Sequence, residues 1–178
     1  MKTIKHISFG ILLVVATILS SCSSDGGSGG GGGTGSVGTF KAKIGSTNFT
    51  SIPQAANAIL ATNGTFQNLS MSGADASGKS LILTIIGENI GVGTYALQDQ
   101  GTPIVSGTYT EANLSNPAAS IVFGAPYDGG GNSGSIIITA KTATNVQGTF
   151  SFTAINATTG SGTKAITNGV FNLNITSN

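Results

Sequence analysis

The sequence predicts an all-β domain over residues 39–178, and three observations support that prediction. Apolar runs of about 5–8 residues recur along this region, many of them alternating with polar residues. Turn signals such as Ser77-Gly78 and Asn116-Pro117 separate the runs. One run, residues 79–86, carries five large aliphatic side chains, as expected of a central strand. We therefore expect an antiparallel two-sheet β-sandwich, with a closed, lipocalin-like β-barrel as the alternative.

Ten segments of the domain are expected to be strands. Residues 66–72 place Leu69 and Met71 on one face and serine and asparagine on the other, the alternation of a half-buried strand. The last segment likewise places Phe171 and Leu173 on one face. In chain order, the expected strands are residues 39–44, 48–51, 66–72, 79–86, 94–97, 104–110, 119–123, 135–140, 146–154 and 165–175.

Two local patterns add detail to this prediction. Residues 53–61 fit the β pattern least, because they are rich in alanine and include Ile59 and Leu60. We expect them to form one or two turns of helix, or a loop that packs onto the domain. In Thr167-Asn168-Gly169, the Asn-Gly pair suits positive φ values, and we expect a tight hairpin or a bulge there.

The first 21 residues are typical of a secretory signal. Lys2 and Lys5 precede an uncharged apolar run over residues 7–19, which is shorter than the ~20 residues that cross a bilayer core. The motif Leu19-Ser20-Ser21-Cys22 resembles the lipobox, in which the thiol accepts a diacylglyceryl group and the chain is cleaved before it. Cys22 is the only cysteine. We therefore expect a lipoprotein held to a membrane by lipid on Cys22.

Residues 22–38, the lipidated cysteine and the segment after it, are expected to be a flexible tether. Almost every residue from 25 to 38 is glycine, serine or threonine, so the segment has almost no apolar surface to bury. A coil of about 15 residues has an r.m.s. reach of roughly 20 Å. The domain is thus expected to lie close to the membrane surface, at the end of this tether.

Charge and composition exclude several classes of function. After residues 1–21 are removed, five lysines and six acidic residues remain, a net charge of 5 − 6 = −1. The chain has no arginine and its lysines are scattered, which excludes nucleic acid as a partner. The only histidine, His6, leaves with the signal, so Ser-His-Asp catalysis and zinc sites lack an imidazole. We expect no enzyme and no cofactor beyond the lipid on Cys22.

Carboxylates are the remaining candidates for catalysis. A pair of them could hydrolyse glycosidic bonds. The candidates lie in expected turns or loops, where solvated carboxylates are common, and we expect no catalytic pair among them. They are Asp75, Glu88, Asp99, Glu111 and Asp128.

A glycine-rich loop is a weak candidate for a ligand or calcium site. The motif Asp128-Gly129-Gly130-Gly131-Asn132 supplies a carboxylate, an amide and flexible carbonyls, all hard oxygen ligands. Beyond Asp128 and Asn132, the motif lacks the further acidic residues and the closing glutamate of an EF-hand loop. We therefore favour a plain hairpin loop over a calcium site, and we expect no other metal site.

Sugar binding would need an exposed aromatic face. Tyr127 is the best candidate because it flanks this glycine-rich loop. Tyr95 and Tyr109 each follow Gly-Thr in an expected strand, so we expect both to pack in the core or at a sheet edge with the hydroxyl in water.

Several segments together resemble a family of small lipoproteins of Bacteroidota known only as a domain of unknown function. The likeness spans most of residues 39–176, although Phe49 stands where the resemblance leads us to expect tryptophan. It implies an exported β domain and carries no catalytic residues. The segments are Phe40-Lys41-Ala42-Lys43-Ile44, Gly93-Thr94-Tyr95, Gly134-Ser135-Ile136-Ile137-Ile138-Thr139, Gly148-Thr149-Phe150-Ser151-Phe152 and Thr167-Asn168-Gly169-Val170-Phe171.

These observations together predict a lipid-anchored protein of the cell envelope. We expect the outer membrane, and leave open whether the domain faces the cell surface or the periplasm, because Ser23-Ser24-Asp25 offers only one of the acids that the resemblance associates with surface export. The expected role is a non-catalytic binding or adhesion module for a glycan or protein. The alternatives are a carrier of an apolar ligand inside a barrel and a purely structural envelope protein. An interior filled by Ile and Phe would count against the carrier.

Overall fold

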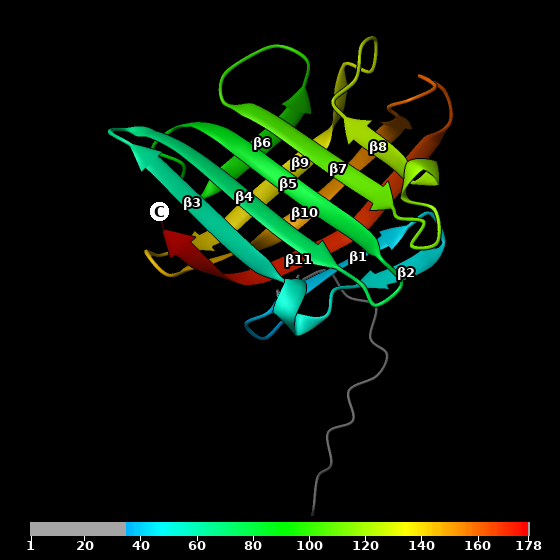
Figure 1. Cartoon of the computed structure of the whole chain (residues 1–178). Coiled ribbons are helices and arrows are strands. Elements are labelled where there is room, and N and C mark those ends of the chain that lie inside the picture. The colour runs from blue at the N-terminus through cyan, green and yellow to red at the C-terminus, as the bar shows by residue number, and fades with distance from the viewer. Residues whose placement is uncertain (1–34, 178) are drawn as a thin grey trace, which may run out of the picture. The chain divides into compact units, whose positions relative to one another are not determined.

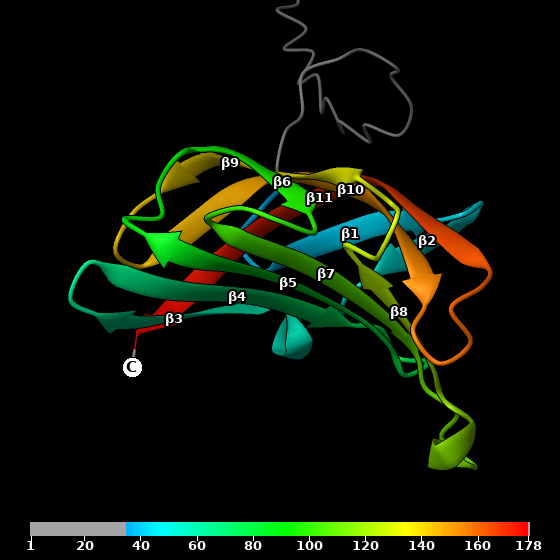
Figure 2. The same cartoon turned by 90° about the horizontal axis from the view of Figure 1, so that it is seen from above.

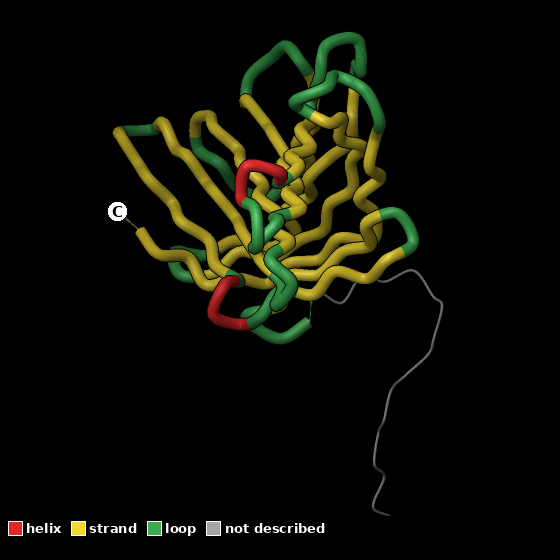
Figure 3. Tube along the Cα trace, turned by 45° about the vertical axis from the view of Figure 1, so that its right-hand side comes forward, coloured by secondary structure: helices red, strands yellow, loops and turns green. Residues whose placement is uncertain are grey.

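Strands account for most of residues 35–177, the part of the chain that the computed structural model describes (Figures 1 and 3). The strands are β1 (Thr39–Ile44), β2 (Thr47–Thr50), β3 (Asn57–Asn63), β4 (Phe66–Ala74), β5 (Lys79–Glu88), β6 (Gly93–Gln98), β7 (Ile104–Glu111), β8 (Ile121–Ala125), β9 (Asn132–Lys141), β10 (Asn145–Asn156) and β11 (Thr163–Ser177). Two single turns of 3-10 helix, η1 (Pro53–Ala55) and η2 (Pro117–Ala119), are the helical segments of the described residues. The expected all-β class is therefore confirmed.

All eleven strands belong to one mixed sheet, in the order β2-β1-β11-β3-β4-β5-β7-β8-β10-β9-β6. A further pairing of β10 with β11 joins seven of them into a partial ring, β11-β3-β4-β5-β7-β8-β10. The pairings are antiparallel except that of β11 with β3, which is parallel. The expected arrangement of two purely antiparallel sheets is not what these pairings show. Neither a two-sheet sandwich nor a closed barrel is confirmed.

The ring is joined at two short places. At one, the end of β10 pairs with Phe123 and Gly124 of β8. At the other, residues 175–177 of β11 lie beside residues 58–60 of β3. This parallel pairing arises because β11 is long: its earlier part lies between β1 and β10, and its last residues extend past both.

The strands are arranged as two curved layers around one core. Strands β3, β4, β5 and β7 run across the layer that contains β9, β10 and β11 (Figures 1 and 2). Phenylalanine rings occupy much of the space between them, and Phe150 has its ring centre 5.3 Å from that of Phe40 and 6.4 Å from that of Phe171. The apolar face of each layer is thereby buried against the other.

Glycines within the strands make room for these rings. In each of four pairs, a Cβ atom on the glycine would come within 2.7 Å of a phenylalanine ring atom, so only glycine fits without a shift of the ring. Glycine in a strand interior otherwise weakens the strand, and close packing of this kind is a usual reason for it. The pairs are Gly73 with Phe40, Gly107 with Phe152, Gly148 with Phe171 and Gly169 with Phe150.

The fold departs from the sequence prediction at residues 53–61. One helical turn is present, η1 at residues 53–55, but residues 57–63 are strand β3, so the expectation of helix or packed loop is wrong for residues 57–61. Ala58 and Leu60 are buried whereas Ile59 is 43% exposed, which is the alternation of a strand. Tertiary pairing outweighs the helical preference of alanine, because β4 on one side and β11 on the other supply hydrogen-bond partners.

The remaining sequence expectations about elements are confirmed. Each of the ten expected strands is present, with ends that differ by up to three residues. Asn168 has φ of +51° and lies where the pairing of β11 shifts against both β1 and β10, so the expected bulge is confirmed.

The segment just before β1 is bonded to β11. The Asn172 side-chain amide donates to the Gly35 carbonyl at 2.8 Å, and the Gly38 amide donates to the Asn172 carbonyl at 2.8 Å. The expected signal, Cys22 and most of the expected tether lie outside the described residues. Within residues 35–177, no helix is long and apolar enough to cross a membrane.

Candidate functional site

A pocket of about 400 Å³ opens at one end of the domain, where β4, β5 and β7 meet the loops on either side of β6. The loop from β6 to β7 rises at the top of Figure 1. We call this site the apolar pocket. Its lining residues are Phe66, Ile86, Gly87, Glu88, Ile90, Tyr95, Thr102, Pro103 and Ile104.

The sheet register brings the apolar side chains of this pocket together. Phe66 of β4 is paired with Glu88 of β5, and Ile86 of β5 is paired with Ile104 of β7. Phe66 is 51% exposed and Ile104 is 58% exposed, although each is a large apolar residue within a strand. Contiguous exposed apolar surface of this kind marks binding sites more often than chance exposure does.

Two contacts hold the loops of the pocket against the strands. Pro103 packs on Gly87, where an added Cβ would lie 2.7 Å from the proline Cβ. On the other side, the Ile90 amide donates to the side-chain oxygen of Gln67 at 2.9 Å, and the Ile90 side chain is buried. The pocket is therefore shaped by packed and hydrogen-bonded groups.

Tyr95 contributes its ring to the pocket while its hydroxyl is engaged elsewhere. The hydroxyl donates to the Gly91 carbonyl at 2.8 Å and accepts from the Gly91 amide at 3.0 Å. The sequence analysis expected a packed ring with its hydroxyl in water, and this hydroxyl instead bonds the backbone. The bonds hold residues 89–92 close to the ring.

The pocket has a single charged group. Glu88 is exposed, and among residues 35–177 it forms no ion pair. The arrangement is thus an apolar surface with one carboxylate at its rim, which can hold an apolar group but offers no second carboxylate for acid–base chemistry.

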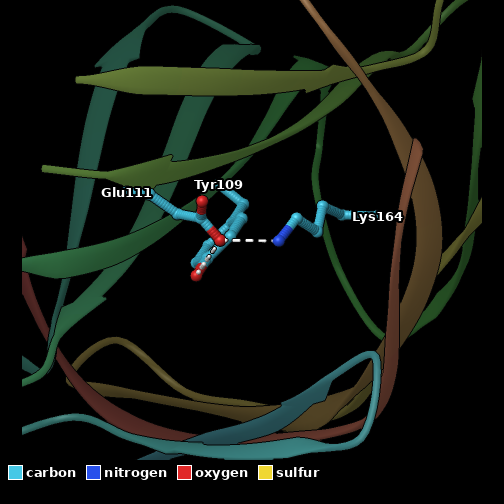
Figure 4. Close-up of polar contacts among 3 residues, drawn as sticks. All are labelled: Tyr109, Glu111 and Lys164. Carbon is cyan, nitrogen blue, oxygen red and sulfur yellow. Dashed lines mark hydrogen bonds and ion pairs between the residues drawn. The ribbon is translucent and has the colours of Figure 1, made fainter. Parts of the chain in front are cut away.

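Apart from the apolar pocket, a cluster of polar side chains connects β7 with β11 (Figure 4). The Tyr109 hydroxyl donates to Glu111 Oε1 at 3.1 Å, and Lys164 Nζ forms an ion pair with the same oxygen at 2.8 Å. The Lys164 ammonium also lies 5.4 Å from the centre of the Phe123 ring, within cation–π range. Tyr109 is only 1% exposed, so its expected place in the core is confirmed, but its hydroxyl is bonded to protein.

The electrostatics of this cluster favour an ionised glutamate and a neutral tyrosine. Burial raises the pKa of Tyr109, and the negative charge of Glu111 raises it further. Burial also raises the pKa of Glu111, but hydrogen bonds from Lys164 and Tyr109 outweigh it and lower that pKa overall. The sequence analysis placed Glu111 among solvated turn carboxylates, which is wrong because it ends β7 and is ion-paired.

This cluster is too confined to be a ligand site. The hollow that it lines has a volume of only about 60 Å³, against the ~30 Å³ that one water molecule takes up in the liquid. We regard Tyr109, Glu111 and Lys164 as a polar tie between the two layers. Tyr109 and Glu111 point the same way because they are two residues apart in a strand, a spacing visible in the sequence.

The glycine-rich loop candidates lie apart from both sites. The Tyr127 ring packs against Gly130, where an added Cβ would lie 2.7 Å from it, and the Tyr127 carbonyl accepts from the Gly130 amide at 2.9 Å. The Asn132 side-chain oxygen accepts from the Gly134 amide at 3.0 Å, and Asp128 is exposed. These contacts describe a hydrogen-bonded turn, and calcium binding there stays a prediction.

The other acidic candidates are dispersed. Asp75 accepts hydrogen bonds from the Ser77 amide and hydroxyl and from the Lys79 amide, which is the turn role expected of it. Within residues 35–177, no three His, Cys, Asp or Glu side chains gather into a group that could hold a metal ion. The sequence analysis did not identify the apolar pocket, because its walls come from three separate stretches of chain.

Comparison with known proteins gives one finding. A family model described as a domain of unknown function (DUF6252) matches residues 37–173. No curated protein and no solved structure matches the chain. The match agrees with the family type expected from the resemblance, and it carries no information on an anchor or a source organism.

Proposed function

The chain belongs to the DUF6252 family, and we propose that it is a non-catalytic binding module that receives an apolar group of its ligand in the apolar pocket. The single observation that carries this proposal is the exposure of Phe66 and Ile104 beside a shaped hollow of about 400 Å³. Exposed apolar side chains that line a shaped hollow are typical of a binding site.

The interior of the domain supports this proposal over a carrier with its ligand in the core. Phe40, Phe150, Phe152 and Phe171 fill the space between the layers, and each of these rings lies directly against a glycine. Packing at this density leaves little room for a second apolar body. We therefore propose that the ligand binds outside the core, at the ends of β4, β5 and β7.

For the architecture, we propose a flattened, partly closed barrel rather than two separate sheets. The ring of seven paired strands supports this proposal, because strands of both layers belong to one hydrogen-bonded circuit. It resembles a lipocalin in closure but differs in content, since its interior is occupied by side chains of the chain itself.

For its location, we propose that the module is anchored to the outer membrane by lipid on Cys22, with the cell surface as the favoured face. The lipobox-like motif before Cys22 and the glycine-rich segment after it support this proposal. A Cys22→Ala substitution should release the protein from the membrane fraction, whereas Ser23→Ala should not. Protease treatment of intact cells then tests the face: digestion supports a surface adhesion role, and protection until the outer membrane is broken excludes it.

A neutral apolar dye tests the binding function. The mature chain should bind N-phenyl-1-naphthylamine with a rise in fluorescence, and Phe66→Ser or Ile104→Ser should weaken that binding by about tenfold or more, since each removes apolar contact area. Ile82→Ser is the matched control, because Ile82 is an exposed isoleucine of β5 outside the pocket lining. Equal binding by all variants, or no binding by the wild type, contradicts the proposal and leaves a structural role.

A further inference from the structure

The outer face of the layer opposite β4 and β5 carries a second feature, a long groove in which hydroxyl and amide side chains lie among apolar ones such as Ile137 and Val170. We propose that this groove binds a linear acidic polysaccharide. The inference goes beyond the proposed function, because it uses a different surface and a ligand of opposite character. The groove consists of three adjoining hollows, and we call it the outer groove.

The three hollows adjoin one another across the strands. The first, about 360 Å³, lies over β1, β2 and β11, and it shares Asn168 and Val170 with the second, of about 390 Å³. The second shares Ser151 with the third, of about 190 Å³. Neighbouring strands are about 4.8 Å apart, so a groove that crosses β9, β10, β11, β1 and β2 is about 20 Å long. That length suits an extended polymer.

The positive charge at one end of the groove indicates the charge of the ligand that it would bind. Lys41 and Lys43 lie two residues apart on the same face of β1, and both are exposed. Within residues 35–177, neither lysine forms an ion pair. The three hollows have no acidic residue among their lining side chains. Two unpaired ammonium groups in a groove without carboxylates favour an anionic ligand.

The remaining polar groups of the groove suit a carbohydrate. They are neutral donors and acceptors spread along its length, which can pair with the hydroxyl groups of successive sugar units. A flat anionic membrane would use charge alone and would not need a hollow lined in this way, so we favour the polysaccharide. The groups belong to Asn48, Thr50, Ser135, Thr149, Ser151, Thr153, Thr167 and Asn168.

Two irregular features lie within the groove, and each is independent of its charge. Asn168, shared by two of the hollows, occupies the bulge of β11 with φ of +51°. Such bulges and left-handed residues occur preferentially next to functional sites. Ser133 lines the third hollow and is only 9% exposed, yet its hydroxyl has no hydrogen-bond partner among the described residues. A buried hydroxyl without a partner calls for an explanation, and a ligand bound in this hollow would supply one.

Polygalacturonate, a linear polymer of uronic acid, tests this proposal at low ionic strength. The mature chain should bind polygalacturonate and should not bind dextran, a neutral polymer. The double variant Lys41→Gln/Lys43→Gln should bind about tenfold more weakly, because each lysine contributes a partly solvated charge pair. The matched control, Lys79→Gln/Lys141→Gln, removes the same charge outside the groove and should bind within about twofold of wild type.

Further arms of the experiment separate the alternatives. Ser133→Ala should weaken binding by several-fold while leaving the melting temperature unchanged or slightly raised, because an unpaired buried hydroxyl is removed. Phe66→Ser should leave polygalacturonate binding unchanged, so this inference can fail while the proposed function stands. Equal binding of dextran, or equal weakening by both lysine pairs, overturns the proposal. Binding to phosphatidylglycerol vesicles but not to polygalacturonate would assign the groove to a membrane instead.

Discussion

Single residues in this domain have roles that follow from what lies opposite them. The strand glycines are one such group, since four of them lie directly against phenylalanine rings. Gly124 of β8 differs, because an added Cβ there would meet nothing within 4 Å. The pair Gly107 and Gly124, on neighbouring strands, therefore separates the effect of ring packing from that of a glycine in a strand.

We expect Gly107→Ala to destabilise the domain by about 1–3 kcal/mol, because the new methyl group would force the Phe152 ring out of a packed position. Gly124→Ala should be neutral or stabilising by up to about 1 kcal/mol, since the methyl group meets open space and the unfolded chain loses freedom. Urea unfolding of both variants measures the difference. Equal effects of the two substitutions would mean that the rings do not require glycine.

The polar tie should make the free energy of unfolding depend on pH. The pKa of Glu111 is lowered by Lys164 and Tyr109, so its contribution is complete above the unfolded value of about 4.3 and is lost as the pH falls through the folded pKa. Glu111→Gln should therefore lower the unfolding free energy at pH 7, by at most about 1 kcal/mol because Lys164 is 36% exposed. The difference in unfolding free energy between wild type and variant should disappear at acidic pH.

Unfolding curves measured between pH 7 and pH 3 test this expectation. Lys164→Gln serves as the companion variant, because it removes the cation and should reduce the same pH dependence. A gap that stays constant or widens as the pH falls would show that the ion pair does not stabilise the fold.

At the scale of elements, alternation identified strands well where one face met the core. Strand β4 is an example, since Leu69 and Met71 are fully buried, as the pattern predicts. Strand β3 was not predicted, because Ala58 is small and its burial depends on partners that lie far away in the chain. The apolar pocket escaped for a similar reason: Phe66, Tyr95 and Ile104 come together only through the sheet register and the loops around β6.

Amide hydrogen exchange tests the corrected assignment of β3. Because residues 58–62 are paired in the sheet, with β4 along their length and with β11 at residues 58–60, amides of this stretch that bond either neighbour should exchange as slowly as those in β4. Residues 99–102, which are exposed in the loop from β6 to β7, should exchange quickly and provide the internal control. Fast exchange throughout residues 58–62 would favour the packed loop that the alanine-rich sequence suggested.

At the scale of the whole domain, the residues that stabilise the fold differ from those that line the proposed binding surfaces. The core is filled by the chain's own rings, and the two proposed binding surfaces lie outside it. The composition indicated this division only in part: it led us to expect an envelope module without catalysis through histidine, but it gave no sign of where a ligand would lie. Location depends on which side chains the sheet leaves uncovered, and that follows from register.

The central claim is that an apolar ligand binds at the end of β4, β5 and β7 and not inside the domain. Mapping by NMR of the mature chain, titrated with N-phenyl-1-naphthylamine, tests it most directly. We predict shifts in the side-chain signals of Phe66, Ile86 and Ile104, with those of Phe150 and Phe152 unchanged. Shifts centred on Phe150 and Phe152, with Phe66 and Ile104 unaffected, would contradict the account and restore the interior carrier.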